Sequence, residues 1–345
     1  MASPAARARS RSRRPAGASA CTRRASSRAA RAGRNGGFGL RGGATTYDLA
    51  RTQLGRERAQ AYWQLTERYV DRLEELAGDA FRRVGSLRLA ADPAERDELR
   101  AEYDALVEDG FAAEWQEELD GPLRGRFHCA VLHPPDGSLI PGRWARRLAG
   151  LAAEAGAELR EHARVELLAE LDADRIVIAT DGYTHGLVPE LDDAIRPVRN
   201  QVVLTEPLPE RLFDRPHYAR HGYDYWQQLP DGRLLVGGRR DADLAGEATA
   251  DESLTPAVQE SLETLVRELV GPSPRITHRW PGIFGVTRDR LPLAGPLPEQ
   301  DRIWVSAGFS GHGNVLGLAC GDLAARAILG ETTPELELFA PARLL

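Results

Sequence analysis

Apolar residues recur near helical spacing in several segments of the chain, which we interpret as amphipathic helices. In the longest of them, leucines and tyrosines mark one face from residue 51 onward, and Gly78 provides a stop. Asp92-Pro93 opens another, since proline suits the first helical position. The pattern predicts helices at 51–77, 93–109, 143–155, 255–270 and 314–329.

Other apolar segments are short and bounded by turn residues, as β-strands are. The run RIVIAT (175–180) predicts a strand buried on both faces, which is typical of a parallel sheet in an α/β protein. The turn Pro230-Asp231-Gly232 predicts an antiparallel hairpin. Strands are expected at 84–90, 126–132, 175–180, 198–205, 223–229, 233–238 and 303–308.

The composition is that of an ordinary globular protein. The chain has 345 residues, of which 42% are hydrophobic and 28% charged, and this length predicts about two domains. No stretch approaches the roughly 18 consecutive apolar residues of a membrane span. The three cysteines lie far apart without a CxxC pair, which excludes a disulfide framework and favours a reducing, cytoplasmic setting.

Every basic residue is an arginine, and the chain has no lysine. This excludes a lysine Schiff base and a P-loop lysine. Residues 1–34 hold ten arginines and no acid, so the rest of the chain carries a net charge of −16 against −6 for the whole. An acidic body argues against a nucleic-acid-binding function.

Residues 1–32 are almost wholly Ala, Arg, Ser, Gly and Pro, and they show no periodicity that would supply a core strand. Four interpretations compete. The segment is a disordered basic tail, a transit peptide, a nucleic-acid-binding arm, or coding sequence translated in a wrong frame.

The strongest chemical motif is a strand, a glycine-rich loop (GFSGHG, 308–313) and a helix. Glycines let backbone amides approach a ligand, and the helix start offers unpaired N–H groups to an anionic or electron-accepting ring. A tight strand-to-helix turn would have the same sequence. His312 lies inside this loop and is a candidate contact for a cofactor or substrate.

Two further motifs are weaker. GRNGGF (33–38) could form a nest of backbone amides for a phosphate, although a flexible loop would look the same. ATDGY (179–183) follows a buried strand, where α/β proteins bind ligands, although a plain turn explains it too. No metal-binding motif is present.

Together these segments resemble the D-amino-acid-oxidase-like superfamily of FAD-dependent oxidoreductases, and within it most closely the gamma-glutamylputrescine oxidase group. The resemblance spans about residues 33–330. It rests on segments that occur in family order, namely GRNGGF (33–38), RLAGLAAEAGAEL (147–159), RIVIATDGYT (175–184), IRPVRNQVVLTEPL (195–208), RWPGIFGVTRDRLPLAG (279–295) and GFSGHGNVLGLACG (308–321).

The resemblance implies an α/β (α+β) flavoprotein with non-covalent FAD. Its FAD-binding, Rossmann-like domain would comprise 33–85, 140–195 and 296–335, interleaved with an antiparallel-sheet substrate domain at 86–139 and 196–295. The residues implied to bind FAD are Gly33, Arg34, Asn35, Gly36, Gly37, Phe38, Val165, Ala179, Thr180, Gly182, Gly311, His312, Gly313 and Asn314.

One family feature is missing. The family opens with a βαβ unit that carries a GxGxxG turn, and here residues 1–32 stand in its place. We interpret those residues as frame-shifted, with family register resuming near Gly33. This predicts a sheet without its central strand and a half-built FAD site, so a catalytically inactive or flavin-free remnant is the alternative function.

The activity implied is oxidation of an amine or amino acid to an imine by hydride transfer to the flavin, followed by hydrolysis. Dioxygen or another acceptor would then take the electrons. His312, Trp280, Tyr225 and Arg288 are the candidate catalytic residues, with Arg288 pairing with a substrate carboxylate. Tyr223 and Trp226 would add to an aromatic substrate wall.

Overall fold

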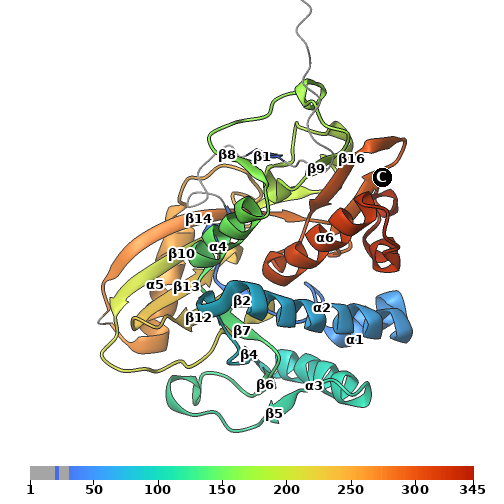
Figure 1. The fold of residues 1–345 in the computed structure, drawn as a ribbon. Coiled ribbons are helices and arrows are strands. Elements are labelled where there is room, and N and C mark those ends of the chain that lie inside the picture. Colours follow the sequence, from blue (N-terminus) through green and yellow to red (C-terminus); the bar gives the residue numbers. More distant parts are fainter. Residues whose placement is uncertain (1–19, 23–30, 273) are drawn as a thin grey trace, which may run out of the picture.

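The computed structural model describes residues 20–22, 31–272 and 274–345, and its largest element is an eight-stranded sheet (Figure 1). The strands are β4 (Ser86–Leu89), β5 (Glu114–Gln116), β6 (Ala130–His133), β10 (Arg196–Pro207), β11 (His217–Ala219), β12 (Asp224–Gln228), β13 (Arg233–Gly238) and β14 (Ile276–Val286). They are ordered β14-β10-β13-β12-β11-β4-β6-β5. Neighbours run antiparallel except β11 and β4, which are parallel.

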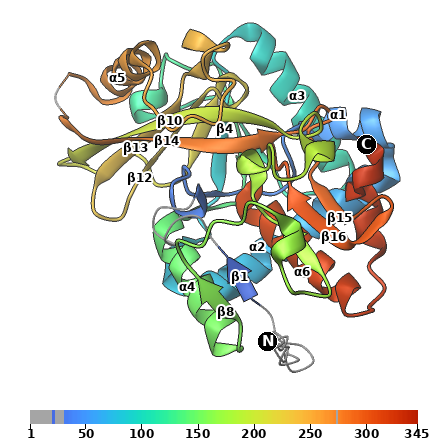
Figure 2. The same cartoon turned by 90° about the horizontal axis from the view of Figure 1, so that it is seen from above.

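Helix α5 (Pro256–Val270) covers one face of this sheet (Figure 2). Its leucines and valines share a core with Trp226 and Val236. Because side chains alternate along a strand, Trp226 faces α5 while its neighbour Tyr225 faces the other side. The prediction that Trp226 belongs to a substrate wall is therefore wrong, since that side chain is fully buried against α5.

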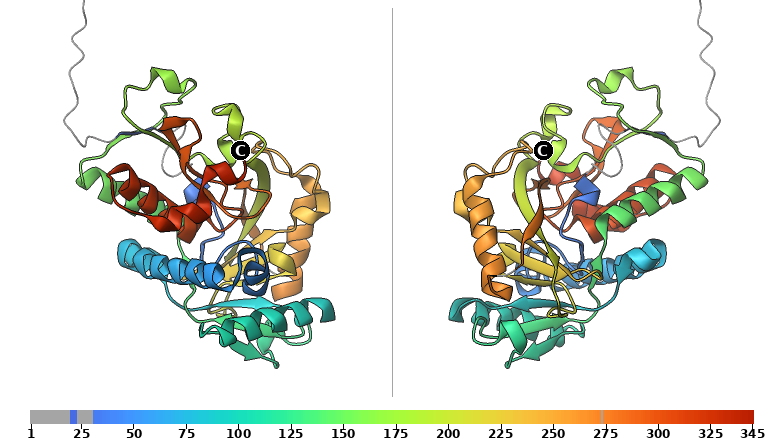
Figure 3. Two further views of the ribbon diagram at one scale, coloured as in Figure 1. Left: turned by 90° about the vertical axis from the view of Figure 1, so that its right-hand side faces the viewer. Right: turned by 90° about the vertical axis from the view of Figure 1, so that its left-hand side faces the viewer.

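A second core joins three helices on the other side of the sheet from α5 (Figure 3). These are α1 (Tyr47–Leu54), α2 (Arg56–Ala77) and α6 (Gly313–Ile328). Helix α6 packs between α2 and a three-stranded sheet of β15 (Leu293–Leu297), β16 (Gln300–Ala307) and β9 (Ile176–Ile178). Helices α3 (Pro93–Glu108) and α4 (Pro141–Glu154) and a small sheet of β2 (Phe38–Gly39), β7 (Gly137–Leu139) and β3 (Phe81–Arg82) complete this part.

The predicted helices are present, with one correction. The segment 51–77 is two helices rather than one, because Gly55 has a φ of 83° and interrupts the helical backbone. The amide of Gly55 still donates to the carbonyl of Arg51 and so closes α1. At the start of α3, Asp92 accepts a hydrogen bond from the Glu95 amide at 2.8 Å, as an N-cap does.

Strand β9 lies at an edge of its sheet, with β16 as its only strand partner among the described residues. Ile176 and Ile178 are buried, but Val177 between them is 43% exposed. The prediction of a strand buried on both faces is wrong here. One face of β9 lacks the cover that a parallel sheet ordinarily has on both sides.

A short strand, β1 (Ala20–Thr22), pairs in parallel with β8 (Glu158–Arg160) as a separate two-stranded sheet. All three residues of β8 are exposed, so this pair adds no core. Apart from β1 and residues 31–32, the segment 1–32 lies outside the described residues. Its four interpretations therefore stay untested.

Buried histidines give the fold a pH dependence. His217 lies flat against Trp226, with ring centroids 5.3 Å apart, and its Nδ1 atom has no hydrogen-bond partner. Burial lowers the pKa of His217 to about 3, from an ordinary value of 6.5. The unfolded chain therefore binds a proton between pH 6.5 and 3 that the folded chain does not, and stability falls as the pH falls through this window.

We expect His217→Phe to reduce the loss of stability between pH 7.5 and pH 5 by about 2 kcal/mol, while preserving the aromatic contact with Trp226. Urea unfolding at the two pH values measures this difference. His278→Phe, at an exposed position, is the control and should leave the pH dependence as it is in the wild type. Equal pH dependence in the wild type and His217→Phe would contradict the assignment.

Candidate functional site

Two glycine-rich loops, 33–38 and 308–314, meet through a pair of asparagines. Asn35 Nδ2 donates to Asn314 Oδ1 at 3.2 Å, and Asn314 Nδ2 donates to Asn35 Oδ1 at 3.1 Å. Asn314 also donates to the carbonyl of Phe38 at 2.8 Å. Segments almost at opposite ends of the described chain are thus held together at the start of α6.

The loop before α6 turns sharply at residues with positive φ. Ser310 has φ 50° and Gly311 has φ 97°. His312 follows as the N-cap, and its Nδ1 atom is buried without a hydrogen-bond partner. Burial lowers the pKa of His312 to about 4, so its imidazole is neutral at pH 7. A neutral ring beside the amide end of a helix favours a hydrogen-bond acceptor or an electron-rich group as its neighbour.

Asp181 holds this loop to two other segments. Its Oδ1 accepts from the amides of Gly308 and Phe309 at 2.9 and 3.3 Å, and its Oδ2 accepts from the Gly285 amide at 3.1 Å. Because Asp181 follows the end of β9 by only three positions, its carboxylate joins the end of β9 to β14 and to the loop before α6.

The sheet face opposite α5 packs against the 33–38 loop. Trp280 Nε1 donates to the carbonyl of Arg34 at 2.8 Å. Tyr225 lies edge-on to Phe38, with ring centroids 5.7 Å apart. Its ring also lies within 2.7 Å of where a Cβ on Gly36 would be, so that position requires glycine. Two predicted catalytic residues, Tyr225 and Trp280, are therefore brought to the predicted cofactor loop.

The side chain of Arg34 is held by two residues from other segments of the chain, Glu252 and Tyr183. Its guanidinium pairs with Glu252 at 2.9 Å and donates to the Tyr183 hydroxyl at 3.2 Å. Tyr183 in turn donates to Glu252 at 2.5 Å. The Nε atom of Arg34 is buried and has no hydrogen-bond partner. Arg34, next to Asn35 in the sequence, and His312, two residues before Asn314, thus each have one nitrogen without a hydrogen-bond partner.

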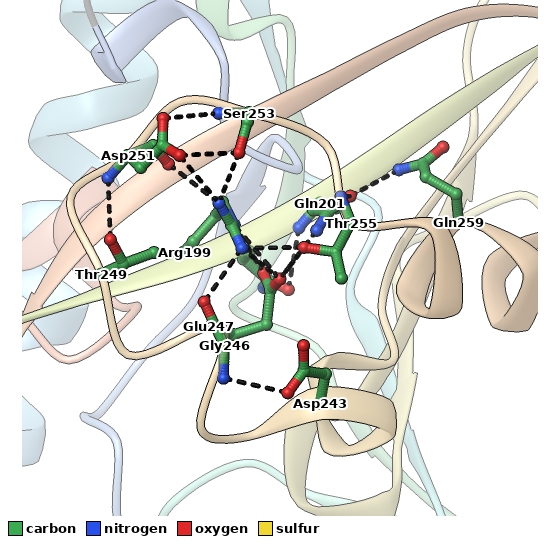
Figure 4. Close-up of polar contacts among 11 residues, drawn as sticks. Arg199, Gln201, Asp243, Gly246, Glu247, Thr249, Asp251, Ser253, Thr255 and Gln259 are labelled. Atoms are coloured by element: carbon green, nitrogen blue, oxygen red, sulfur yellow. Dashed lines mark hydrogen bonds and ion pairs between the residues drawn. The ribbon is translucent and has the colours of Figure 1, made fainter.

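The segment that carries Glu252 is anchored by a buried ion pair, which we call the Arg199 cluster (Figure 4). Arg199 on β10 bonds Glu247 at 2.8 Å, and their side chains are only 6% and 1% exposed. Further hydrogen bonds tie the cluster to the 246–255 segment and to α5. They involve Gly246, Asp251, Ser253, Thr255, Gln201 and Gln259.

Other predicted residues have different surroundings. Arg288 is exposed and donates to the backbone carbonyl of Leu344 at 3.0 Å. Val165 is partly buried in the segment between β8 and β9, and Ala179 is exposed just after β9. Thr180 shares a 2.8 Å hydrogen bond with Thr184. Gly182 is buried, and a Cβ there would lie 2.7 Å from the Phe284 backbone.

Sequence reasoning missed two residues that organise this site. Asp181 stands within the ATDGY motif, and an Asp after a buried strand and before a glycine was a usable indication. Glu252 lies in a polar stretch that no local pattern marks, so only the folded chain shows its contact with Arg34.

No group of three or more His, Cys, Asp or Glu side chains suited to a metal ion occurs in the described residues. Within the same residues, no helix has the length and apolar character needed to cross a membrane.

Comparisons with known proteins agree with this architecture. The probable oxidoreductase OrdL of Rhizobium meliloti (strain 1021) is 27% identical over 339 residues, covering 90% of this chain and 77% of that protein. A glycine oxidase of Pseudomonas aeruginosa is 26% identical over 182 residues, or 50% of this chain and 47% of that protein. The crystal structure of glycine oxidase from Geobacillus kaustophilus superposes with a TM-score of 0.77 at 22% identity, covering 94% of this chain and 92% of that one.

A sequence model of the FAD dependent oxidoreductase family, DAO, matches residues 16–327 and so begins upstream of the first motif at Gly33. The match spans most of the chain, and the structural superposition independently supports the fold. The chain therefore belongs to the DAO family of FAD-dependent oxidoreductases.

Proposed function

We propose that this chain oxidises the C–N bond of a small amine or amino acid with FAD as cofactor. The observation that carries the proposal is the junction of loops 33–38 and 308–314 through Asn35 and Asn314, together with the contacts that Tyr225 and Trp280 make with the first of these loops. The comparisons support an oxidoreductase of this family, and glycine oxidases are among the similar proteins.

The residues at the junction fit the flavin end of such a cofactor. His312 and Arg34 each offer one unsatisfied nitrogen, and α6 presents its amide end at the same place. We assign contacts with the isoalloxazine to Gly311, His312, Gly313 and Asn314, and contacts near the pyrophosphate and the flavin to Gly33, Arg34, Asn35, Gly36, Gly37 and Phe38. Ala179, Thr180 and Gly182 would line the cofactor, and the backbone of Val165 would contact its adenine side.

When bound, FAD would supply the two-electron acceptor for oxidation of the C–N bond, with dioxygen or another acceptor as the final oxidant; water would hydrolyse the imine product to a carbonyl compound and ammonia or an amine. The chain's own residues hold the substrate and exclude water. Tyr225 and Trp280 form an apolar wall on the sheet face. His312, with a pKa of about 4, is a weak base at pH 7, and we assign it hydrogen bonding and orientation rather than proton removal.

The alternative is a flavin-free remnant of the family, and two observations favour it, one on β9 and one on the family's GxGxxG turn. Among the described residues β9 has an unpaired edge and an exposed Val177, and the GxGxxG string at 37–42 contains β2 instead of following a strand, as the turn that holds the adenosine half of the cofactor does. The two functions differ in whether FAD remains bound to the purified chain.

We expect the purified chain, incubated with FAD and desalted, to keep a visible flavin spectrum. Asn314→Ala removes both asparagine hydrogen bonds and the bond to Phe38, so retained flavin should fall at least tenfold. Gln53→Ala, at an exposed position on α1, is the matched control and should retain flavin like the wild type. A folded wild-type chain without flavin would show that the chain is a flavin-free remnant of the family. Retained flavin would justify a screen of amines and amino acids as substrates.

The same proposal places the enzyme in the reducing cytoplasm. All three cysteines are free, with Cys129 and Cys320 buried and Cys21 exposed, which supports this setting. We also propose the division into an FAD domain and a substrate domain. In its support, every strand of the eight-stranded sheet falls within 86–139 or 196–295.

A further inference from the structure

The 33–38 loop and the 246–255 segment meet in a two-pronged ion pair between Arg34 and Glu252. Arg34 Nη1 donates to Glu252 Oε2 at 3.1 Å, and Arg34 Nη2 donates to Glu252 Oε1 at 2.9 Å. A guanidinium binds a carboxylate and a phosphate group through the same pair of parallel N–H donors. The Glu252 carboxylate therefore occupies the donors with which Arg34 would bind an anionic ligand.

The chain on both sides of Glu252 is fixed by the Arg199 cluster (Figure 4). Arg199 Nη1 donates to the carbonyl of Asp251 at 3.3 Å and to the hydroxyl of Ser253 at 3.0 Å. Ser253 in turn donates to the Asp251 carboxylate, from its amide at 3.1 Å and from its hydroxyl at 2.8 Å. Because these bonds hold the two neighbours of Glu252, rotation of the Glu252 side chain alone is enough to release Arg34.

The two partners of the pair differ in how firmly they are held. The Glu252 side chain is 43% exposed and can turn toward solvent, whereas the Arg34 side chain is only 21% exposed. Arg34 also has anchors other than Glu252, since its Nη2 donates to the Tyr183 hydroxyl at 3.2 Å and its carbonyl accepts from Trp280 at 2.8 Å. Rotation of Glu252 into solvent would thus leave a positioned guanidinium, whose Nε atom is buried without a hydrogen-bond partner.

We propose that Glu252 is an intramolecular competitor for an anion at Arg34, so that a diphosphate group binds this guanidinium only when the Glu252 side chain has turned away. The inference rests on the proposed function, which assigns the 33–38 loop to contacts near the pyrophosphate of FAD, and it adds a regulation of that site. A ligand that binds one of two conformations has its apparent affinity reduced by the fraction of chains in that conformation. A partly exposed ion pair is weak enough for a ligand to displace. Glu252 therefore weakens diphosphate binding without preventing it.

The first test needs no flavin. Inorganic pyrophosphate is titrated against the full chain at constant ionic strength, and the thermal stabilisation is recorded. Glu252→Gln removes the charge but keeps the size of the side chain, so this variant should bind pyrophosphate about fivefold more tightly than the wild type. Arg34→Met should lose this binding. Glu263→Gln is the matched control, because Glu263 forms a comparably half-exposed pair with Arg279 at 2.6 Å, and it should bind like the wild type.

The second test identifies the source of the diphosphate. The change in flavin fluorescence measures the binding of FAD and of riboflavin, which has no phosphate group, to the same preparations. Tighter binding of FAD by Glu252→Gln, with riboflavin binding unchanged, supports competition with the diphosphate of the cofactor. Tighter binding of pyrophosphate alone supports competition with a separate diphosphate ligand, and it removes Arg34 from the contacts proposed for FAD.

The two proposals fail in different ways. Glu252→Gln that binds pyrophosphate no more tightly than the wild type overturns the competition, as does Arg34→Met that binds it like the wild type. Equal tightening in Glu252→Gln and Glu263→Gln also overturns it, because the effect would then follow the net charge of the chain. A chain that shows the expected pyrophosphate binding but binds no FAD defeats the proposed oxidation and leaves the competition at Arg34 standing.

Discussion

Arg199→Met is expected to lower the free energy of unfolding by about 3–5 kcal/mol, because it leaves a buried carboxylate without its counter-charge. Glu247 is only 1% exposed, and Arg199 supplies its three closest cationic contacts, at 2.8 and 3.1 Å. Hydrogen bonds from Gln201 and Thr255 would remain, but neither side chain carries a charge.

Urea unfolding at pH 7.5 measures this loss. Arg72→Met is the matched control, since its pair with Glu75 is largely exposed, and it should change stability by less than about 0.5 kcal/mol. The double variant Arg199→Met/Glu247→Met should recover much of the loss, because it removes both charges together. A double variant as unstable as Arg199→Met would show that the unpaired charge is not the cause.

Asp181→Ala should cost about 3 kcal/mol or more and abolish flavin retention. The substitution leaves the amides of Gly285, Gly308 and Phe309 without their acceptor, and an unsatisfied buried amide costs about 1–3 kcal/mol. It also places alanine at a φ of 49°, a backbone conformation that Asp tolerates better.

Thermal unfolding and the flavin spectrum after desalting measure the two effects. Asp172→Ala, at an exposed position before β9, should behave as the wild type in both. Asp181→Asn keeps an acceptor oxygen and should be intermediate. A stable Asp181→Ala chain that retains flavin would show that the loop before α6 does not need the hydrogen bonds to the Asp181 carboxylate.

Much of the fold was predictable because local patterns carry it. The Asp92 cap, the Pro230-Asp231-Gly232 hairpin and the stretch RLLVGG at 233–238 are decided by neighbouring residues, and the structure has them as predicted. Of the two glycine loops that meet at Asn35 and Asn314, the loop 308–313 shows an explicit pattern, glycines between a strand and a helix, whereas 33–38 shows only clustered glycines.

The rest depended on contacts between distant segments. Tyr225 and Trp226 look equivalent in the sequence, and only the side on which α5 packs decides that Trp226 is core. Val177 is exposed because no described element fully covers its face of β9. The apolar sequence of the strand cannot indicate this. Glu252 is an ordinary charged residue until its partner, Arg34, is known.

The asparagine pair can form only after most of the chain has been synthesised. Asn35 and Asn314 are separated by 279 positions, so a ribosome working at about 5–20 residues per second delivers the second roughly 15–60 s after the first. During that interval the 33–38 loop has no partner at α6 and must wait in an incomplete nascent chain. Under the proposed function, cofactor capture is consequently a late event of biosynthesis, after α6 has emerged.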